Sequence, residues 1–273
     1  MRAIARRRVR TVRLEAPPRT REDALAVEEP LEVQVNGSRF SVTMRTPGDD
    51  FDLVAGFLVS EGVVSAADDL PAMRVVTGVA ANGEPTFNIV DATVLGPGVR
   101  AVAERARTLY TTSACGVCGL ASIDAVTTAS SHPVLALGLA VEEAVVAALP
   151  DRLRAAQRLF DSTGGVHAAG LFDADGEPLV VREDVGRHNA VDKVIGHALR
   201  DGRLPLSRTV LQVSGRASFE LVQKARMAGI PMLAAVSAPS SLAVELAQEA
   251  GITLVGFSRG RSFNVYAHPH RIV

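Results

Sequence analysis

The 273-residue chain has no tryptophan, two tyrosines and only two cysteines. A structural disulfide framework needs several cysteines in a short secreted chain, so the sequence excludes this class of protein. Aromatic residues make up 4% of the chain and hydrophobic residues 47%, so the core must be built from aliphatic side chains. Such cores are common in α/β proteins, whose parallel strands are buried on both faces.

Long apolar segments and a strong net charge are also lacking. The best apolar stretch, residues 133–149, is interrupted by Glu142 and Glu143, which argues against a membrane span. The net charge of −1 gives no general attraction to nucleic acid. No apolar region follows the basic N-terminus, as a signal peptide would require. We therefore expect a soluble, cytoplasmic protein without nucleic-acid or membrane partners.

The N-terminus differs from the rest of the chain in charge, because eight arginines lie within the first 21 residues. A segment of this composition is typical of a solvated tail that lacks a packed core. We predict that residues 1–27 form a basic, disordered extension. The alternative is an arm that contacts an anionic partner.

Residues 28–110 are predicted to form a small β-rich subdomain. Alternating apolar residues at 31–35 and 40–44 flank Asn36-Gly37-Ser38, a strong signal for a β-hairpin. A second hairpin is expected over residues 73–79 and 86–94. Between the hairpins, a helix should begin at Asp49 or Asp50 and end at Gly62.

Residues 111–273 are predicted to form an α/β core that begins with the cysteine motif. The expected strands cover residues 166–172, 178–181, 209–213, 231–236 and 252–257. The expected helices cover residues 141–160, with a second start at Pro150, and residues 188–200, 216–228 and 240–250. Short buried strands alternating with helices of this length predict βαβ crossovers and a mainly parallel sheet.

The two cysteines lie three residues apart, in the run Cys115-Gly116-Val117-Cys118-Gly119. The small residues around them suit an exposed loop, and the glycines permit positive φ. A structural zinc site would need two further ligands. A dithiol redox couple and a persulfide-forming sulfur carrier both fit the spacing. The motif alone leaves these three interpretations open.

Polar residues follow three of the predicted strands, at the edge of the sheet where α/β proteins bind ligands. These runs are Ser214-Gly215-Arg216, residues 237–241 and residues 258–262. Helix capping explains the serines, but the arginines favour an anion site. Neither a glycine-rich dinucleotide motif nor a Walker A loop is present. We therefore expect a phosphorylated or nucleotide-like ligand.

The densest polar cluster runs from Arg182 to Asn189, with Asp192 and Lys193 one turn later. His188 and Lys193 could orient an anion or supply a proton. We expect Asp184 to cap the following helix. His167, which lies apart from this cluster, has the context of a buried core histidine.

The cysteine run from Thr111 to Gly119, the block from Arg182 to Lys193 and the end from Phe257 to Pro269 resemble three motifs of the FdhD family. These proteins are formate dehydrogenase accessory sulfurtransferases. The resemblance covers about residues 30 to 272. It implies a cytidine-deaminase-like, three-layer α/β/α sheet with a smaller N-terminal β-rich unit, and a homodimer.

The resemblance also implies a function. Family members accept persulfide sulfur from an IscS-type cysteine desulfurase and transfer it to the molybdenum cofactor destined for formate dehydrogenase. That cofactor is bis(molybdopterin guanine dinucleotide), so a GDP-like nucleotide should occupy the same site. Cys115 would carry the persulfide and Cys118 would assist or share it. The expected cofactor-binding residues are Phe257, Ser258, Arg259, Gly260, Arg261, Ser262, Ser214, Gly215, Arg216 and His188; no metal site is expected.

Three rival functions remain. A zinc deaminase would need a His-x-Glu motif and a Pro-Cys-x-x-Cys motif, but Ala114 precedes the first cysteine and Ala168-Ala169 follows His167. A non-catalytic chaperone could escort the molybdenum cofactor while the cysteines serve regulation. A thioredoxin-like oxidoreductase would place the cysteines at the start of a helix in a βαβ unit, which this sequence does not do.

Overall fold

The computed structural model describes residues 2–79, 85–96, 98–99, 130–134 and 138–273. Its N-terminal sheet contains β3 (Glu29–Val35), β4 (Ser38–Arg45), β5 (Ala72–Val79) and β6 (Pro85–Thr93), in the order β4-β3-β6-β5. Both predicted hairpins are confirmed as antiparallel pairs. Asn36 and Gly37 have φ angles of 50° and 76°, the left-handed conformation that a tight hairpin turn requires.

The main sheet has six strands in the order β12-β11-β10-β9-β7-β8. Its strands are β7 (His167–Phe172), β8 (Pro178–Asp184), β9 (Val210–Val213), β10 (Met232–Ala235), β11 (Thr253–Arg259) and β12 (Ser262–Ala267). The helices are α1 (Asp50–Ser60), α3 (Glu143–Ala155), α4 (Arg158–Thr163), α5 (Arg187–Arg200), α6 (Phe219–Met227) and α7 (Ser241–Ala250), with 3-10 turns η1 (Ala67–Asp69) and η3 (Pro269–Arg271).

The prediction of a mainly parallel sheet is wrong. Only β9, β10 and β11 pair in parallel, whereas β7 is antiparallel to both β8 and β9, and β12 is antiparallel to β11. The reason lies in the connections. Tight turns join β7 to β8 and β11 to β12, and a parallel pair would need a crossover of a dozen residues or more.

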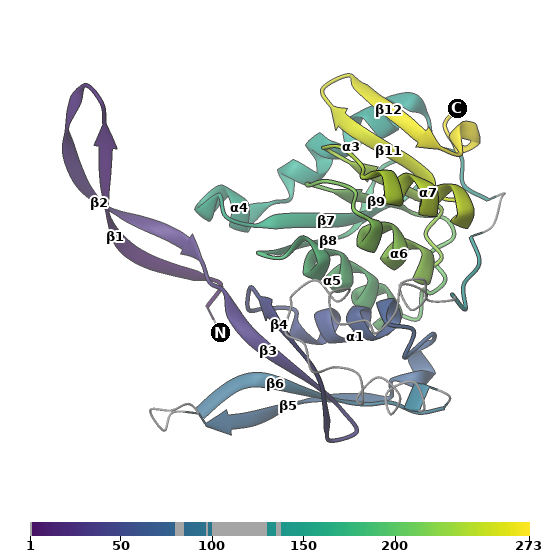
Figure 1. The fold of residues 1–273 in the computed structure, drawn as a ribbon, viewed down its shortest axis with the longest axis horizontal. Coiled ribbons are helices and arrows are strands. Elements are labelled where there is room, and N and C mark those ends of the chain that lie inside the picture. Colours follow the sequence, from purple (N-terminus) through teal and green to yellow (C-terminus); the bar gives the residue numbers. More distant parts are fainter. Residues whose placement is uncertain (1, 80–84, 97, 100–129, 135–137) are drawn as a thin grey trace.

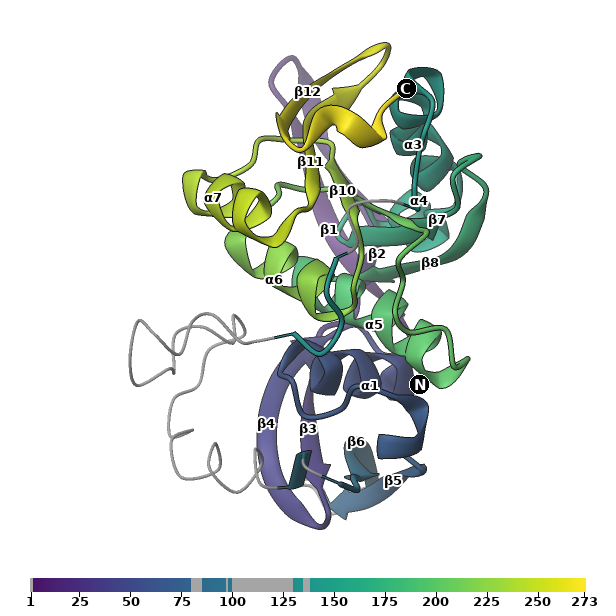
Figure 2. The ribbon, with the colours of Figure 1, turned by 90° about the vertical axis from the view of Figure 1, so that its right-hand side faces the viewer.

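Side chains on the two faces of the main sheet belong to two separate clusters, which defines three layers. Leu211 and Val213 of β9 pack in the cluster that contains α5, α6 and α7. Val210 of the same strand faces the opposite way and packs with Val146 and Leu149 of α3. Figures 1 and 2 show helices on both sides of the sheet. The predicted α/β/α architecture is therefore confirmed.

Helix α1 joins the N-terminal sheet to the main sheet, because it lies between the small sheet and α5 (Figure 1). Two glycines allow the two helices to come unusually close. A Cβ atom added at Gly56 would lie 1.8 Å from the backbone oxygen of Asp192, and one added at Gly196 would lie 1.8 Å from that of Asp52. No side chain fits at either position. The buried residues of the two units belong to one continuous core.

A buried carboxylate fixes the same junction. Asp184 is fully buried at the end of β8, and its oxygens accept hydrogen bonds from the backbone N–H groups of Thr46 at 3.1 Å and Gly186 at 2.8 Å. The Lys193 ammonium lies 2.8 Å away and also donates to the Thr46 carbonyl at 3.0 Å. The Asn189 amide completes the set at 3.0 Å. The end of β4 is thereby held against the start of α5.

Residues 4–26 form an ordered two-stranded ribbon, so the prediction of a disordered N-terminal extension is wrong. β1 (Ile4–Arg13) pairs antiparallel with β2 (Ala16–Ala26), and the ribbon projects away from the rest of the molecule (Figure 1). Acidic residues just beyond the arginine-rich run offset part of its repulsion: Glu22 pairs with Arg6 and Asp23 with Arg21.

Pro150 lies inside α3 and does not begin a second helix, contrary to the prediction. Proline removes the hydrogen bond that its missing N–H would donate to the carbonyl four residues earlier. That carbonyl belongs to Val146, and it accepts a long, 3.5 Å hydrogen bond from the buried Ser258 hydroxyl of β11. A side chain of the sheet therefore replaces the lost backbone donor and the helix continues.

Replacing Lys193 with Met should lower the free energy of unfolding by about 3–5 kcal/mol, because it leaves the Asp184 charge buried without its partner. Urea unfolding measures this loss. The double variant D184N/K193M should recover part of it, since both charges are then removed. Arg6→Met is the matched control in an exposed ion pair and should cost less than about 1 kcal/mol. Equal losses for the two single variants would contradict the assigned role of Lys193.

Candidate functional site

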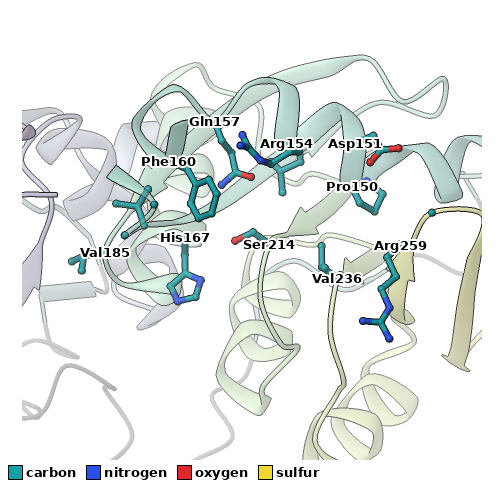
Figure 3. Close-up of a pocket in the computed structure, with 15 residues that line it drawn as sticks. Pro150, Asp151, Arg154, Gln157, Phe160, His167, Val185, Ser214, Val236 and Arg259 are labelled. Carbon is teal, nitrogen blue, oxygen red and sulfur yellow. The ribbon is translucent and has the colours of Figure 1, made fainter. Parts of the chain in front are cut away.

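A cleft of about 550 Å³ lies at the edge of the main sheet where β9, β10 and β11 end (Figure 3). Its lining residues come from the second half of α3, from α4 and the segment after it, and from the strand ends. They are Pro150, Asp151, Leu153, Arg154, Gln157, Phe160, Gly164, Gly165, Val166, His167, Val185, Ser214, Val236, Arg259 and Gly260. The cleft lies where the sequence predicted a ligand, beyond the carboxyl ends of the parallel strands.

Ser214 lies on the floor of the cleft and is held by β7. Its hydroxyl accepts a hydrogen bond from the Ala168 N–H at 2.9 Å, and its own N–H donates to the Ala168 carbonyl at 3.0 Å. It is not a helix cap, since α6 begins at Phe219 with Ser218 at the N-cap. The Ser214 hydroxyl proton is not used in these two bonds, so the side chain can donate to a ligand.

His167 is the one histidine among the described residues that line the cleft. It begins β7, is partly exposed, and packs above Gly215, where an added Cβ would lie 3.5 Å from its Nδ1. Burial and then the charges of Arg187 and His188 hold the pKa of His167 below its ordinary value of 6.5. At neutral pH the imidazole is therefore mostly uncharged. The prediction of a buried core histidine missed its place in the cleft.

Arg259 and Gly260 are the two residues of the 257–262 segment that line the cleft. The strand predicted to end at residue 257 is longer, because β11 continues to Arg259 and β12 begins at Ser262. Phe257 has a φ of 52°, and its ring lies 5.8 Å from the Arg259 guanidinium carbon. This local distortion at the end of β11 accompanies the turn of Arg259 toward the cleft.

Four other predicted ligand residues lie away from the lining. Ser258 is fully buried and bonds to α3, so its side chain is committed to the fold. Arg216, Arg261 and Ser262 are exposed, and within the described part of the chain none of them lines the cleft. The structure therefore brings together Ser214, Arg259 and Gly260, with Gly215 beneath His167.

The polar block after β8 serves the fold more than the cleft. Lys193 is bound in the buried Asp184 ion pair, so the prediction that it orients an anion is wrong. His188 is also outside the lining; its Nε2 lies 3.8 Å from a carboxylate oxygen of Glu220. The neighbouring His188 side chain is the main cause that lowers the pKa of Glu220 to about 2.

The wall formed by α3 and α4 was missed by the sequence analysis. Arg154, Gln157 and Phe160 line it, and the Arg154 guanidinium carbon lies 4.8 Å from the centre of the Phe160 ring. The only available signal was the Gly164-Gly165 pair, where the chain turns from α4 into the cleft floor. Gly164 has a φ of 64° and ends α4 in the left-handed conformation.

Cys115 and Cys118 lie outside the described residues. Among the residues that are described, no group of three or more His, Cys, Asp or Glu side chains is placed to hold a metal ion. No helix in the described ranges is long and apolar enough to cross a membrane.

The fold and cleft define an α/β protein with an arginine-lined cleft at the ends of its parallel strands. The chain belongs to the FdhD/NarQ family, whose model matches residues 26–273. The family resemblance seen in the motifs is therefore confirmed. The ribbon precedes this matched region almost entirely.

Individual relatives match the whole chain. It is 57% identical over 272 residues to the sulfur carrier protein FdhD of Streptomyces avermitilis, covering 99% of this chain and 96% of that protein. It is 55% identical over 275 residues to the sulfur carrier protein FdhD of Mycobacterium tuberculosis, covering 99% of both. A crystal structure from Desulfotalea psychrophila, of a protein assigned as a formate dehydrogenase accessory protein, aligns with a TM-score of 0.74 at 25% identity and covers both chains fully.

NMR titration should give His167 a pKa below 6.5, identified by the signal that a His167→Asn variant lacks. The unfolded state then binds the proton more tightly than the folded state. Above about pH 6.5 the ionisation of His167 therefore leaves the free energy of unfolding unchanged. As pH falls below that value, preferential protonation of the unfolded state lowers the free energy of unfolding. A pKa above 6.5 would contradict the described surroundings of the ring.

Proposed function

We propose that this protein is a sulfur carrier that accepts persulfide sulfur from an IscS-type cysteine desulfurase and delivers it to the molybdenum cofactor before insertion into formate dehydrogenase. The observation that carries the proposal is the extent of its similarity to proteins named sulfur carrier protein FdhD, which covers nearly the full length of both chains. The presence of one thiol pair in the whole sequence agrees with it.

The cleft supports the second half of the proposal. The acceptor, bis(molybdopterin guanine dinucleotide), carries phosphates and guanine. Arg259 and Arg154 supply cationic donors for the phosphates, and Ser214 supplies a hydroxyl. Phe160 offers an aromatic face against which a planar base can pack. The cofactor is a substrate that is modified and released in this scheme, and the dinucleotide portion is the part that the cleft would hold.

The loading step exchanges one sulfur–sulfur bond for another. The Cys115 thiolate attacks the terminal sulfur of the donor persulfide, the donor S–S bond breaks, and the donor cysteine leaves as a thiolate. Cys115 then carries a persulfide, and no net oxidation has occurred.

Transfer of the sulfur to molybdenum requires two electrons, because the outer sulfur of a persulfide is zero-valent whereas a sulfido ligand has the oxidation state −2. Cys118 can supply them together with Cys115. Attack of the Cys118 thiolate on the inner sulfur of the Cys115 persulfide closes a disulfide and releases hydrosulfide. Hydrosulfide would replace an oxygen ligand of the metal, and the oxygen would leave as water with the hydrosulfide proton and one proton from solvent. A cellular thiol must then reduce the disulfide. This scheme assigns the carrier role to Cys115 and the resolving role to Cys118.

Mass spectrometry after incubation with a cysteine desulfurase and cysteine tests the loading step. The chain should gain about 32 Da, the mass of one sulfur atom bound as a persulfide. Cys115→Ala should abolish the gain, whereas Cys118→Ala should load but fail to support formate dehydrogenase. A Cys115→Ala chain that still gains this mass and restores the dehydrogenase would refute the assignment. Full function with serine at both positions would instead indicate a chaperone that only escorts the cofactor.

Calorimetry with GDP tests the cleft as the site of the dinucleotide. Arg259→Ala should weaken GDP binding by about 10- to 100-fold, because a charge-assisted hydrogen bond is lost. Arg261→Ala is the matched control, two residues away in the same family motif but outside the lining of the cleft. It should change the affinity by less than about threefold, because an exposed charge that does not line the cleft makes only a weak, solvent-screened interaction with a ligand there. A larger loss for Arg261→Ala would move the site away from this cleft.

A further inference from the structure

His167 is partly exposed in the cleft, unlike a histidine that serves only to pack the core. It lines the cleft from the start of β7, and its ring makes no hydrogen bond to any other described residue. In Figure 3, Ser214 and Val236 lie between His167 and Arg259, so the histidine and the arginine mark opposite ends of the cleft floor. A partly exposed imidazole that makes no hydrogen bond within the described part of the chain can bind a ligand through either ring nitrogen.

Charged groups surround this ring on several elements. Arg187 and His188 at the start of α5 repel a proton on His167, whereas Asp184 at the end of β8 attracts one. Asp184 is already neutralised by Lys193. The other charged side chains that line the cleft are Asp151 and Arg154 of α3 and Arg259 of β11. The balance favours the neutral imidazole as long as no anion occupies the cleft.

We propose that His167 binds the phosphate group of a nucleoside diphosphate in this cleft and takes up a proton as the ligand binds. The nature of the ligand rests on the proposed function. The assignment of His167 does not, because this residue lies outside the three family motifs. A phosphate beside the ring would offset the repulsion from Arg187 and His188 and favour the imidazolium form. By reciprocity, protonation of His167 strengthens ligand binding.

The coupling has a definite sign. Between the pKa values of His167 in the free and the ligand-bound protein, the affinity for the ligand falls as pH rises, by up to about tenfold per pH unit. Above the bound-state value His167 stays neutral in both states and its contribution becomes independent of pH. The cleft therefore binds its phosphorylated ligand more tightly in mildly acidic than in alkaline solution.

Calorimetry with GDP in two buffers of equal pH and different ionisation enthalpy measures proton uptake directly. The wild-type chain should take up more protons per GDP at pH 7 than a His167→Gln variant, which has a polar side chain that does not titrate. The comparison is needed because the GDP phosphate also titrates near this pH. His167→Arg keeps a permanent cation and should bind GDP without the extra uptake. His270→Gln, an exposed histidine outside the cleft, is the control and should behave as wild type.

Equal proton uptake by the wild-type and His167→Gln chains would overturn the inference. So would a wild-type affinity for GDP that does not fall between pH 6 and pH 8, after correction for the ionisation of GDP itself. Absence of any GDP binding would overturn both the nucleotide cleft and this inference. It would leave the sulfur-carrier function intact if the chain still acquires a persulfide, so the two failures are distinguishable.

Discussion

The buried Asp184 carboxylate is the interaction on which the arrangement of the molecule depends. It receives donors from two segments: Thr46 at the end of β4, and Gly186, Asn189 and Lys193 at the start of α5. A fully buried charge is tolerated only when its hydrogen bonds are complete, so these segments cannot shift independently. The close approach of α1 to α5 at Gly56 and Gly196 then follows, and the two sheets share a core. The same constraint positions Val185 on the cleft and Arg187 and His188 beside His167.

Much of the fold could be predicted from local patterns, and the errors have identifiable causes. The hairpin with Asn36-Gly37 at its turn and the helix that ends at Gly251 are determined by residues close in sequence, and both form as predicted. The N-terminal ribbon was missed because the acids that pair with its arginines, Glu22 and Asp23, lie just beyond the basic run. The continuous α3 was missed because the group that compensates for Pro150 is Ser258, more than a hundred residues away. Such contacts leave no local signal.

The candidate site shows the same division. The edge of the sheet at which the cleft lies follows from chain order, and Ser214 and Arg259, which the sequence places at this edge, line the cleft. Which of their neighbours also line it depends on strand ends that the sequence does not mark. Ser258 and Lys193 carry suitable chemistry and are nevertheless used by the fold. His167 and the α3–α4 wall carry no motif and nevertheless line the cleft. Family membership adds the likeness to sulfur carriers, which the spacing of two cysteines could not supply.

In the function proposed above, one molecule carries sulfur on Cys115 and passes it to a cofactor held by its dinucleotide in the cleft. A single-turnover chase tests this most directly. Protein loaded with radioactive persulfide is mixed with bis(molybdopterin guanine dinucleotide) cofactor, with and without excess GDP. We expect the label to move to the cofactor, and GDP to block this transfer without impairing the loading of Cys115. Transfer that proceeds at the same rate in saturating GDP, or label that never leaves the protein for the cofactor, would contradict this proposal.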